Sequence, residues 1–237
     1  MILMNTGPEL ALRYAPIVHF DRNEPLNPRG IGYTVFRETG RSNSFPNRTV
    51  NVPEGASFVI EYAYYFDYDI EHMYDLEHIW VTVAEDGAVM GAQGSFHGKY
   101  LNLTVPQLPG ASAPSGTHIH AFCQPGKHAF LAAGELTRLY PGWDECCSSR
   151  AGGPVLVGAP FSAAHSPAGR DLYVPEKSDD RHSFRYLREV LAFAPSLIFE
   201  ERKPPDFVYM PWETLYTLIP GWIEAECRRL DSLYGKE

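Results

Sequence analysis

Histidines and acids gather in one region of this chain. Six of its nine histidines fall between residues 72 and 128, namely His72, His78, His97, His118, His120 and His128. Five acids precede or open the same region, at Asp67, Asp69, Glu71, Asp75 and Glu77. Carboxylate oxygens and imidazole nitrogens together suit a divalent cation, from Mg²⁺ or Ca²⁺ to Mn²⁺ or Zn²⁺. We therefore expect the functional site of the protein in this region, with one divalent cation as its cofactor.

The spacing of the acids narrows the candidate ligands. Asp75 and Glu77 are two residues apart, so both side chains point to one face of an extended strand. Glu77 shares that face with the apolar residues of 79–83, which we expect to be buried. A carboxylate at the edge of a buried strand face needs a cation or hydrogen bonds to compensate its negative charge. A metal site and a hydrogen-bonded loop with a salt bridge both satisfy this need, and the spacing leaves both open.

Three further histidines are candidates for binding a ligand beside the cation. His97 ends a predicted strand next to Gly98, and His128 follows a Pro-Gly turn at the start of another. His120 shares a strand face with His118 and Phe122, which fits either a core position or a pocket. We predict that His97, His120 and His128 bind the ligand, whereas His78 alternates away from Glu77 and packs on the opposite sheet face.

The elements that position these residues are mostly strands. β-Branched and aromatic residues predict strands over 17–20, 31–36 and 118–123, and a central strand over 57–66. Asp86-Gly87 predicts a hairpin between strands at 77–84 and 88–96, because this dipeptide supplies the positive φ of a tight turn. The apolar period becomes helical after Asp180, and Pro211 and Pro220 predict two short helices over 212–218 and 222–230.

These elements predict a mainly β protein, an antiparallel β-sandwich with long loops and C-terminal helices. We find no linker poor enough in apolar residues to divide the chain. We therefore expect a single domain over residues 1–237. Within it, residues 11–133 form the β-sandwich core with the metal site, and the helical part over 180–237 packs on this core.

Composition excludes several classes of function. The 20 basic and 29 acidic residues give a formal charge of −9, and no basic stripe follows a nucleic-acid backbone, so we expect no nucleic-acid partner. No apolar run reaches the roughly twenty residues of a membrane span. The start of the chain lacks a secretion signal, so a cytoplasmic location is expected. Serine-nucleophile, P-loop and zincin motifs are absent. The four cysteines have no zinc-site spacing and are expected to be free thiols.

An aromatic strand followed by a short acidic motif carries a resemblance to a known family. Residues 61–69 read Glu-Tyr-Ala-Tyr-Tyr-Phe-Asp-Tyr-Asp, and His72-x-x-Asp75-x-Glu77 follows. This stretch resembles the core of the necrosis- and ethylene-inducing peptide-like proteins, where such a strand leads into a G-H-R-H-D-W-E signature. Residues 95–100, Ser-Phe-His-Gly-Lys-Tyr, are similar to the S-x-H-G-x-Y segment of the same family.

Other segments resemble a related family of vacuolar-sorting-associated β-sandwich proteins. Residues 13–24 match its R-Y-A-P-x-x-x-F-D-x-x-E opening, residues 75–78 match its D-W-E-H strand except at Leu76, and residues 126–129 are similar to its G-S-H-A segment. The matches to the two families keep their order along roughly residues 11–133.

The resemblance implies that Asp69, His72, Asp75 and Glu77 surround a divalent cation in a surface pocket, partly through water. In the plant-toxic members this pocket engages the sugar head group of a membrane sphingolipid. The present chain has Glu71 and Leu76 where the signature has Gly and Trp, and its loop between Asp69 and His72 is shorter.

Three functions follow from these observations. The first is a metal-dependent binding module that holds a small polar ligand, such as a glycan or a lipid head group. The second is an intracellular metal-dependent enzyme of the hydrolase or lyase type, in which the cation activates water and a pocket histidine moves a proton. In the third, the ion only ties the loop from Asp69 to Glu77.

Overall fold

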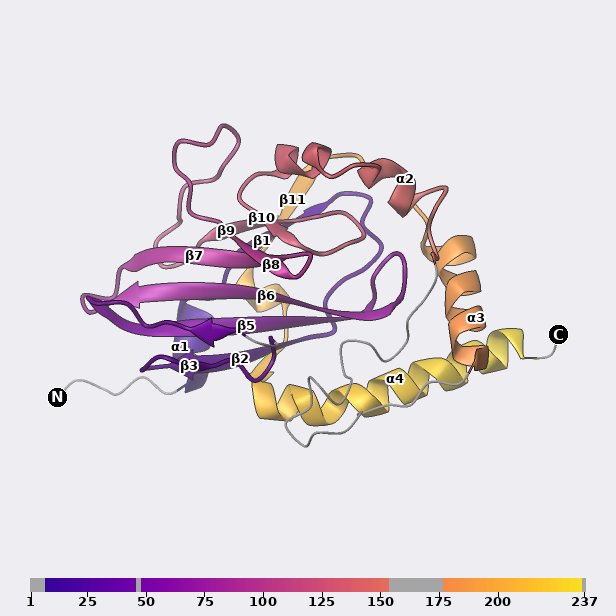
Figure 1. Ribbon diagram of the computed structural model, residues 1–237, viewed down its shortest axis with the longest axis horizontal. Helices are drawn as coiled ribbons and strands as arrows, with labels where there is room; N and C mark the ends of the chain where they lie inside the picture. Colours follow the sequence, from indigo (N-terminus) through magenta and orange to yellow (C-terminus); the bar gives the residue numbers. More distant parts are fainter. Residues whose placement is uncertain (1–6, 46–47, 154–176, 236–237) are drawn as a thin grey trace.

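The computed structural model describes residues 7–45, 48–153 and 177–235, and its architecture is mainly β (Figure 1). Within these ranges twelve strands form three sheets. The six-stranded sheet has the order β12 (Tyr209–Pro211), β2 (Gly30–Phe36), β5 (Ala56–Tyr68), β6 (Met73–Ala84), β7 (Val89–Phe96), β8 (Lys99–Asn102). The four-stranded sheet has the order β10 (Phe130–Leu131), β9 (His120–Cys123), β1 (Ile17–Asp21), β11 (Phe199–Arg202). Strands β3 (Gly40–Arg41) and β4 (Thr49–Val50) form a small hairpin.

Most strand pairs are antiparallel, as the sequence predicts. The pairs β1 with β9 and β12 with β2 are parallel, and each joins segments that are distant in the sequence. The predicted hairpin is confirmed, since β6 pairs antiparallel with β7 across the turn that contains Gly87. The fold class predicted from the sequence is therefore confirmed, with two parallel pairs added to it.

Helices occupy the beginning of the described chain and its second half. They are α1 (Gly7–Arg13), α2 (Trp143–Cys147), α3 (Lys177–Tyr186) with a π-helical continuation (Leu187–Leu191), and α4 (Trp212–Tyr234). Short 3₁₀ segments cover Gly134–Leu139 and Pro204–Asp206. Helix α4 is drawn in yellow below the six-stranded sheet in Figure 1.

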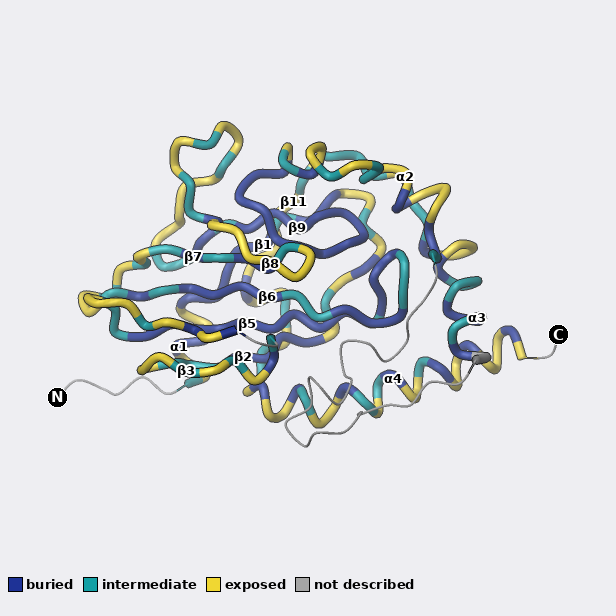
Figure 2. The backbone as a smooth tube through the Cα atoms, viewed as in Figure 1, coloured by how far each residue is buried: buried dark blue, intermediate teal, exposed yellow. Residues whose placement is uncertain are grey.

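Strand β5 is the centre of the large sheet, as its apolar sequence predicts. It pairs with β2 on one side and with β6 on the other. Ile60, Tyr62 and Tyr64 point into the core between the two large sheets, whereas Ala63 and Tyr65 point to the opposite face. Both faces are buried, and most of β5 has the colour of buried residues in Figure 2. A strand buried on both faces reads as a continuous apolar run.

The second face of the large sheet is covered by helices. Helix α4 lays Leu215, Ile219 and Ile223 against it, in one core with Tyr65 and Tyr68 of β5. Small residues on β2 allow this close approach, because a Cβ at Gly32 would lie 3.0 Å from side-chain atoms of Leu215 and Trp212. The sheet therefore separates the core between the sheets from the core under the helices, and a smaller cluster of Val50, Val59 and Trp80 also lies on the face opposite the second sheet.

The prediction of two short C-terminal helices is wrong. Pro220 lies inside a single 23-residue helix, α4. A proline inside a helix removes one backbone hydrogen bond and costs about 3 kcal/mol. The helix continues because its buried face runs past the proline, from Leu215 and Ile219 to Ile223 and Leu230. Burial of each such side chain contributes about 1.5–3 kcal/mol, which outweighs the local defect.

The structure also bears on two expectations from the sequence, one about membrane spans and one about the cysteines. None of the described helices has the length and apolar character to cross a membrane. All four cysteines are buried and free, and the sulfur atoms of Cys146 and Cys147 lie 4.0 Å apart. They are thiols, as predicted.

Substitutions in α4 test whether its buried face holds it on the sheet. Ile219→Ala should lower the free energy of unfolding by about 2–5 kcal/mol, because Ile219 is fully buried and the truncation leaves a cavity. Leu218→Ala, at an exposed neighbour in the same helix, should change it by less than about 0.5 kcal/mol. Urea unfolding followed by circular dichroism measures both variants, and equal losses would contradict the packing described.

Candidate functional site

The predicted metal ligands lie at one end of the sandwich, where β5 turns into β6. Ile79, Val81 and Val83 of β6 face the core between the sheets, as predicted. Asp75 and Glu77 continue the same alternation toward the strand end, where they pair with Phe66 and Tyr64 of β5. The two carboxylates therefore border the core, because the sheet alternation that buries the apolar residues carries them to the same face.

Hydrogen bonds tie three loops together at this end. The turn after β9 accepts a bond at the Gly126 carbonyl from the Ile70 amide (2.8 Å), and its Gly126 amide donates to Glu24 Oε2 (2.6 Å). Gly126 has φ +67°, and a Cβ there would lie 2.8 Å from Cys147 Sγ. The loop after β1, the loop between β5 and β6, and the turn after β9 are therefore fixed to one another.

The turn after β9 brings a lysine to Asp69. Lys127 Nζ lies 2.7 Å from Asp69 Oδ2 and 2.9 Å from Glu71 Oε2, and the Glu71 amide also donates to Asp69 Oδ1 (2.6 Å). Burial alone would raise the pKa of Asp69, but His72 and Lys127 outweigh it and hold the pKa below its ordinary value. Asp69 is thus an ionised carboxylate that already has a cation, the Lys127 ammonium.

His128 lies between two other carboxylates. Its Nδ1 is 3.3 Å from Asp75 Oδ2 and its Nε2 is 3.9 Å from Glu24 Oε1, while its ring stacks on Phe66 with centroids 3.8 Å apart. Burial disfavours the charged ring, but Asp75 and Glu24 outweigh burial and raise the pKa of His128 to about 9. His128 is therefore a buried imidazolium at neutral pH. It was predicted to bind the ligand, and its contacts here are those of a counter-ion.

Glu77 is the acid with the least compensation. Its surroundings raise its pKa well above the ordinary value, first through burial and then through the nearby charge of Asp75, although the Ser95 hydroxyl donates to its Oε2. We call the group formed by these carboxylates and cations the acidic cluster; its members are Glu24, Asp69, Glu71, His72, Asp75, Glu77, Lys127 and His128.

Strained backbone also marks this end of the sandwich. Four non-glycine residues of the described chain have positive φ, and three of them, Tyr74 (43°), His97 (47°) and His128 (56°), belong to segments of the acidic cluster or its rim. Such conformations cost about 1–3 kcal/mol each and concentrate at functional sites. The tertiary structure around the cluster holds these residues in place.

His72 and His97 lie at the edge of the cluster. His72 Nδ1 is 2.9 Å from the Tyr74 carbonyl and its Nε2 is 3.9 Å from Asp69 Oδ1. His97 Nε2 is 2.9 Å from Gln124 Oε1, and its ring stacks on Tyr140 at 4.7 Å. Burial lowers the pKa of His97, so its ring is neutral near pH 7.

The structure brings the four predicted metal ligands to one end of the fold without forming a closed coordination shell. In the described ranges, ligand atoms of three His, Cys, Asp or Glu side chains come within 4.8 Å of one another only at His19, His120 and Glu201. Asp69, His72, Asp75 and Glu77 form no such group. Their assignment as ligands remains a prediction, and it requires bridging water or movement of side chains.

His120, the remaining predicted ligand-binding residue, lies apart from the acidic cluster. It is on β9, where Ala121 and Cys123 face the core, and its Nδ1 is 2.8 Å from His19 Nε2 of β1. His78 lies on the face opposite Glu77, as expected, with its ring stacked on Trp80 and its Nε2 3.0 Å from Ser44 Oγ. Burial there lowers the pKa of His78 to about 3.

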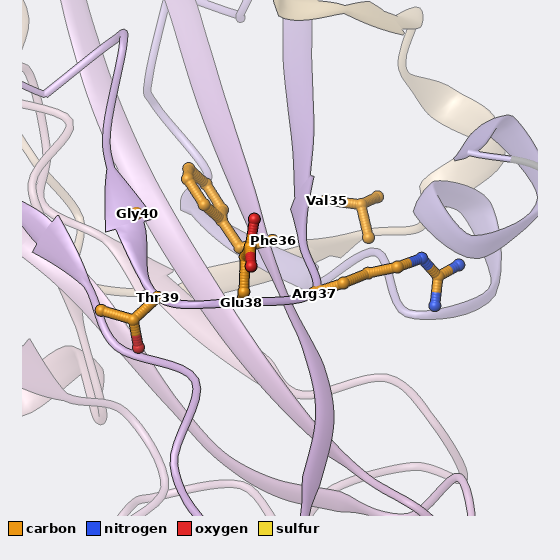
Figure 3. A pocket seen from close by; sticks show the side chains of 6 residues that line it. All are labelled: Val35, Phe36, Arg37, Glu38, Thr39 and Gly40. Carbon is orange, nitrogen blue, oxygen red and sulfur yellow. The ribbon is translucent and has the colours of Figure 1, made fainter.

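Two hollows in the described surface are lined by other residues. Figure 3 shows one of about 470 Å³ over residues 35–40, where β2 ends. The other, of about 280 Å³, lies between the end of β5 and α4 and includes Asp67, Tyr68 and Glu226. None of the predicted ligands lines either hollow, so neither changes the choice of the acidic cluster as the candidate site.

Sequence reasoning did not assign Glu24, Lys127, Ser95 or Gln124 to the site. Signals for three of them were present: Ser95 begins segment 95–100, and Glu24 and Lys127 lie in two more distant segments, 13–24 and 126–129. Neither segment is near Asp75 in the sequence. Only the hydrogen bonds between loops bring them to the same place.

Comparisons with known proteins give one weak likeness. The sequence matches no known family profile and no curated protein. Among solved structures, the crystal structure of a mutant of NLPPya aligns at 17% identity over 67% of this chain and 86% of its own, with a TM-score of 0.33. NLPPya is a necrosis- and ethylene-inducing peptide-like protein, whereas no comparison concerns the vacuolar-sorting-associated family. At this similarity, the evidence for the fold and the site is the geometry of the chain itself.

The buried imidazolium predicts a pH dependence of stability in protein stripped of metal ions. The folded pKa of His128, about 9, exceeds the ordinary 6.5, so the protonated ring contributes stability that is fully present below pH 6.5. This contribution, up to about 3 kcal/mol, should be lost as the pH rises through about 9.

Unfolding by urea at several pH values, for wild type and His128→Gln, isolates this contribution. The difference in unfolding free energy between the two proteins should shrink between pH 6.5 and 9. A difference that stays constant over this range would show that His128 is neutral in the folded protein.

Proposed function

We propose that this protein is a divalent-metal-binding β-sandwich protein that engages a small polar ligand, a glycan or a lipid head group, at the acidic cluster. The observation that carries the proposal is the crowding of Asp75 and Glu77 beside the core. Burial, and then the nearby charge of Asp75, raise the pKa of Glu77 well above its ordinary value. A bound cation would relieve this repulsion, because it favours the charged form of both carboxylates.

The charge balance of the whole cluster supports the same proposal. Five carboxylates, Glu24, Asp69, Glu71, Asp75 and Glu77, face two cations, Lys127 and His128. Buried charges are stable when they are paired or when they coordinate a metal. One divalent cation would bring the cluster close to neutrality.

The positions of the side chains suggest which of the four predicted ligands would contact the cation directly and which would bind it through water. Asp75 and Glu77 follow each other on one strand face and would be the direct ligands. Asp69 is bound by Lys127 and His72 is held by the Tyr74 carbonyl, so both would act through water. Mostly carboxylate and water ligands favour Mg²⁺, Ca²⁺ or Mn²⁺ over softer ions.

His97 is the rim residue placed to contact a ligand. His97 is exposed, and its ring is neutral near pH 7 and is oriented by Gln124 and Tyr140. A neutral imidazole can donate or accept a hydrogen bond to a hydroxyl group of a sugar. The same property supports the alternative function, a metal-dependent hydrolase or lyase in which His97 takes a proton from a metal-activated water.

Metal analysis tests the proposal directly. Wild type purified without chelator should contain one divalent cation per chain, and Asp75→Asn/Glu77→Gln should lose it, as measured by elemental analysis and by calorimetric titration with Mg²⁺, Ca²⁺ and Mn²⁺. Asp67→Asn is the matched control, because this nearby carboxylate is paired with Arg29 instead. Absence of metal from both wild type and variant, with no binding on titration, would refute a metal function.

Variants of His97 separate the alternatives. In a binding module, His97→Gln should keep the metal and weaken binding to a glycan or lipid head-group array. In an enzyme, the same variant should keep the metal and lose turnover in a screen of hydrolase and lyase substrates. If metal removal lowers stability and His97→Gln changes neither binding nor turnover, the ion only ties the loop.

Lys127 provides a second test of the same charge balance. Lys127→Met should destabilise metal-free protein by about 3–5 kcal/mol, because it leaves the buried Asp69 without its cation. Saturating Ca²⁺ should then raise the melting temperature of Lys127→Met by more than that of wild type. An equal shift in the two proteins would contradict the placement of the cation beside Asp69.

A further inference from the structure

A second group of potential ligands lies on the four-stranded sheet. His120, His19 and Glu201 come from three neighbouring strands, β9, β1 and β11. His19 pairs with Glu201 in the antiparallel ladder, and His120 pairs with Ile17, two residues before His19. The alternation of side chains along a strand therefore places all three on the same face of the sheet.

The three side chains meet on that face. His19 Nε2 and His120 Nδ1 are 2.8 Å apart, and one ring nitrogen of each histidine and a Glu201 carboxylate oxygen all lie within 4.8 Å of one another. Phe122 stacks on the His19 ring with centroids 4.5 Å apart and planes at 15°, which fixes the ring orientation. Both histidines are partly buried and Glu201 is exposed, so the group is held by the sheet and open to solvent.

We propose that His19, His120 and Glu201 form a binding site for a first-row transition-metal ion of the Zn²⁺ type. Two imidazoles and one carboxylate are a donor set found in zinc sites with an open position. Nitrogen donors distinguish this site from the acidic cluster, whose oxygen donors suit harder ions. The exposed side leaves a coordination position for water or for a small ligand.

The side chains must adjust to admit the ion, because it replaces the hydrogen bond between His19 and His120. Two nitrogens bound to one tetrahedral zinc ion at 2.0–2.1 Å lie about 3.3 Å apart, so His19 and His120 must separate by about 0.5 Å. One ring now carries a hydrogen on the shared contact, and metal binding requires the tautomer with that hydrogen on its other nitrogen.

The current partner of Glu201 does not block the site. Lys203 Nζ lies 3.4 Å from Glu201 Oε1, and both side chains are largely exposed. Exposed ion pairs of this kind contribute at most about 1 kcal/mol, which a metal–carboxylate bond replaces easily. The inference does not depend on a metal in the acidic cluster, because the two groups share no residue.

Zinc titration of the full chain, stripped beforehand with chelator, tests the proposal. Wild type should bind one equivalent of Zn²⁺. His19→Gln, His120→Asn and Glu201→Gln should each lower the affinity for this ion, the two histidine variants at least 100-fold. Loss of a ligand should exceed the 10- to 100-fold loss that follows removal of a residue that only supports a ligand. Competition with a chromophoric chelator measures the affinity, and circular dichroism melts confirm that the variants fold.

Two controls make the result specific. Glu200→Gln alters the neighbouring carboxylate on β11, which pairs with Arg22, and should keep wild-type zinc affinity. Asp75→Asn/Glu77→Gln should also keep this equivalent. Equal zinc affinity in wild type and all three site variants, or loss of the ion in Asp75→Asn/Glu77→Gln with retention in His120→Asn, would overturn the proposal.

Discussion

The burial of both faces of β5 is the constraint on which the rest of the structure depends. One face needs a second sheet and the other needs helices, because each presents large aromatic side chains that must leave water. The four-stranded sheet supplies the first cover and α4 the second. The same strand then leads through the loop at Asp69 into β6, so the acids at this turn lie where the core between the sheets meets solvent.

Charge balance controls the acidic cluster at that boundary. Lys127 and His128 come from one turn and pair with carboxylates of the loop after β5 and of strand β6, so the turn is connected to these segments electrostatically as well as through backbone bonds. Removing one partner from such a network leaves a buried charge without compensation, which is far more costly than the pair is favourable. The cluster is therefore held together whether or not a cation is bound, and Glu77 is the member whose state a cation would change most.

The two candidate metal sites differ in chemistry for a structural reason. The acidic cluster combines Asp75 and Glu77 on β6 with acids from two loops, Glu24, Asp69 and Glu71, and hydrogen bonds between loops hold these acids there. The group at His19, His120 and Glu201 consists of residues on regular strands, where the ladder register sets the distances between side chains. A site on a ladder is stiff, and its donor set favours a different class of ion from that of the loops.

The sequence by itself determined the long strands β5, β6 and β7, because alternation and aromatic content are local properties that they keep in the folded protein, whereas it did not predict short strands such as β11 and β12. It also placed Asp75 and Glu77 on one face at the edge of the core, since the period of a strand is fixed. It could not determine that Pro220 is accommodated within α4, because burial against the sheet outweighs a local preference. It could not pair Lys127 with Asp69, or His19 with His120, because these contacts join segments that are far apart in the chain and depend on loop closure and strand order.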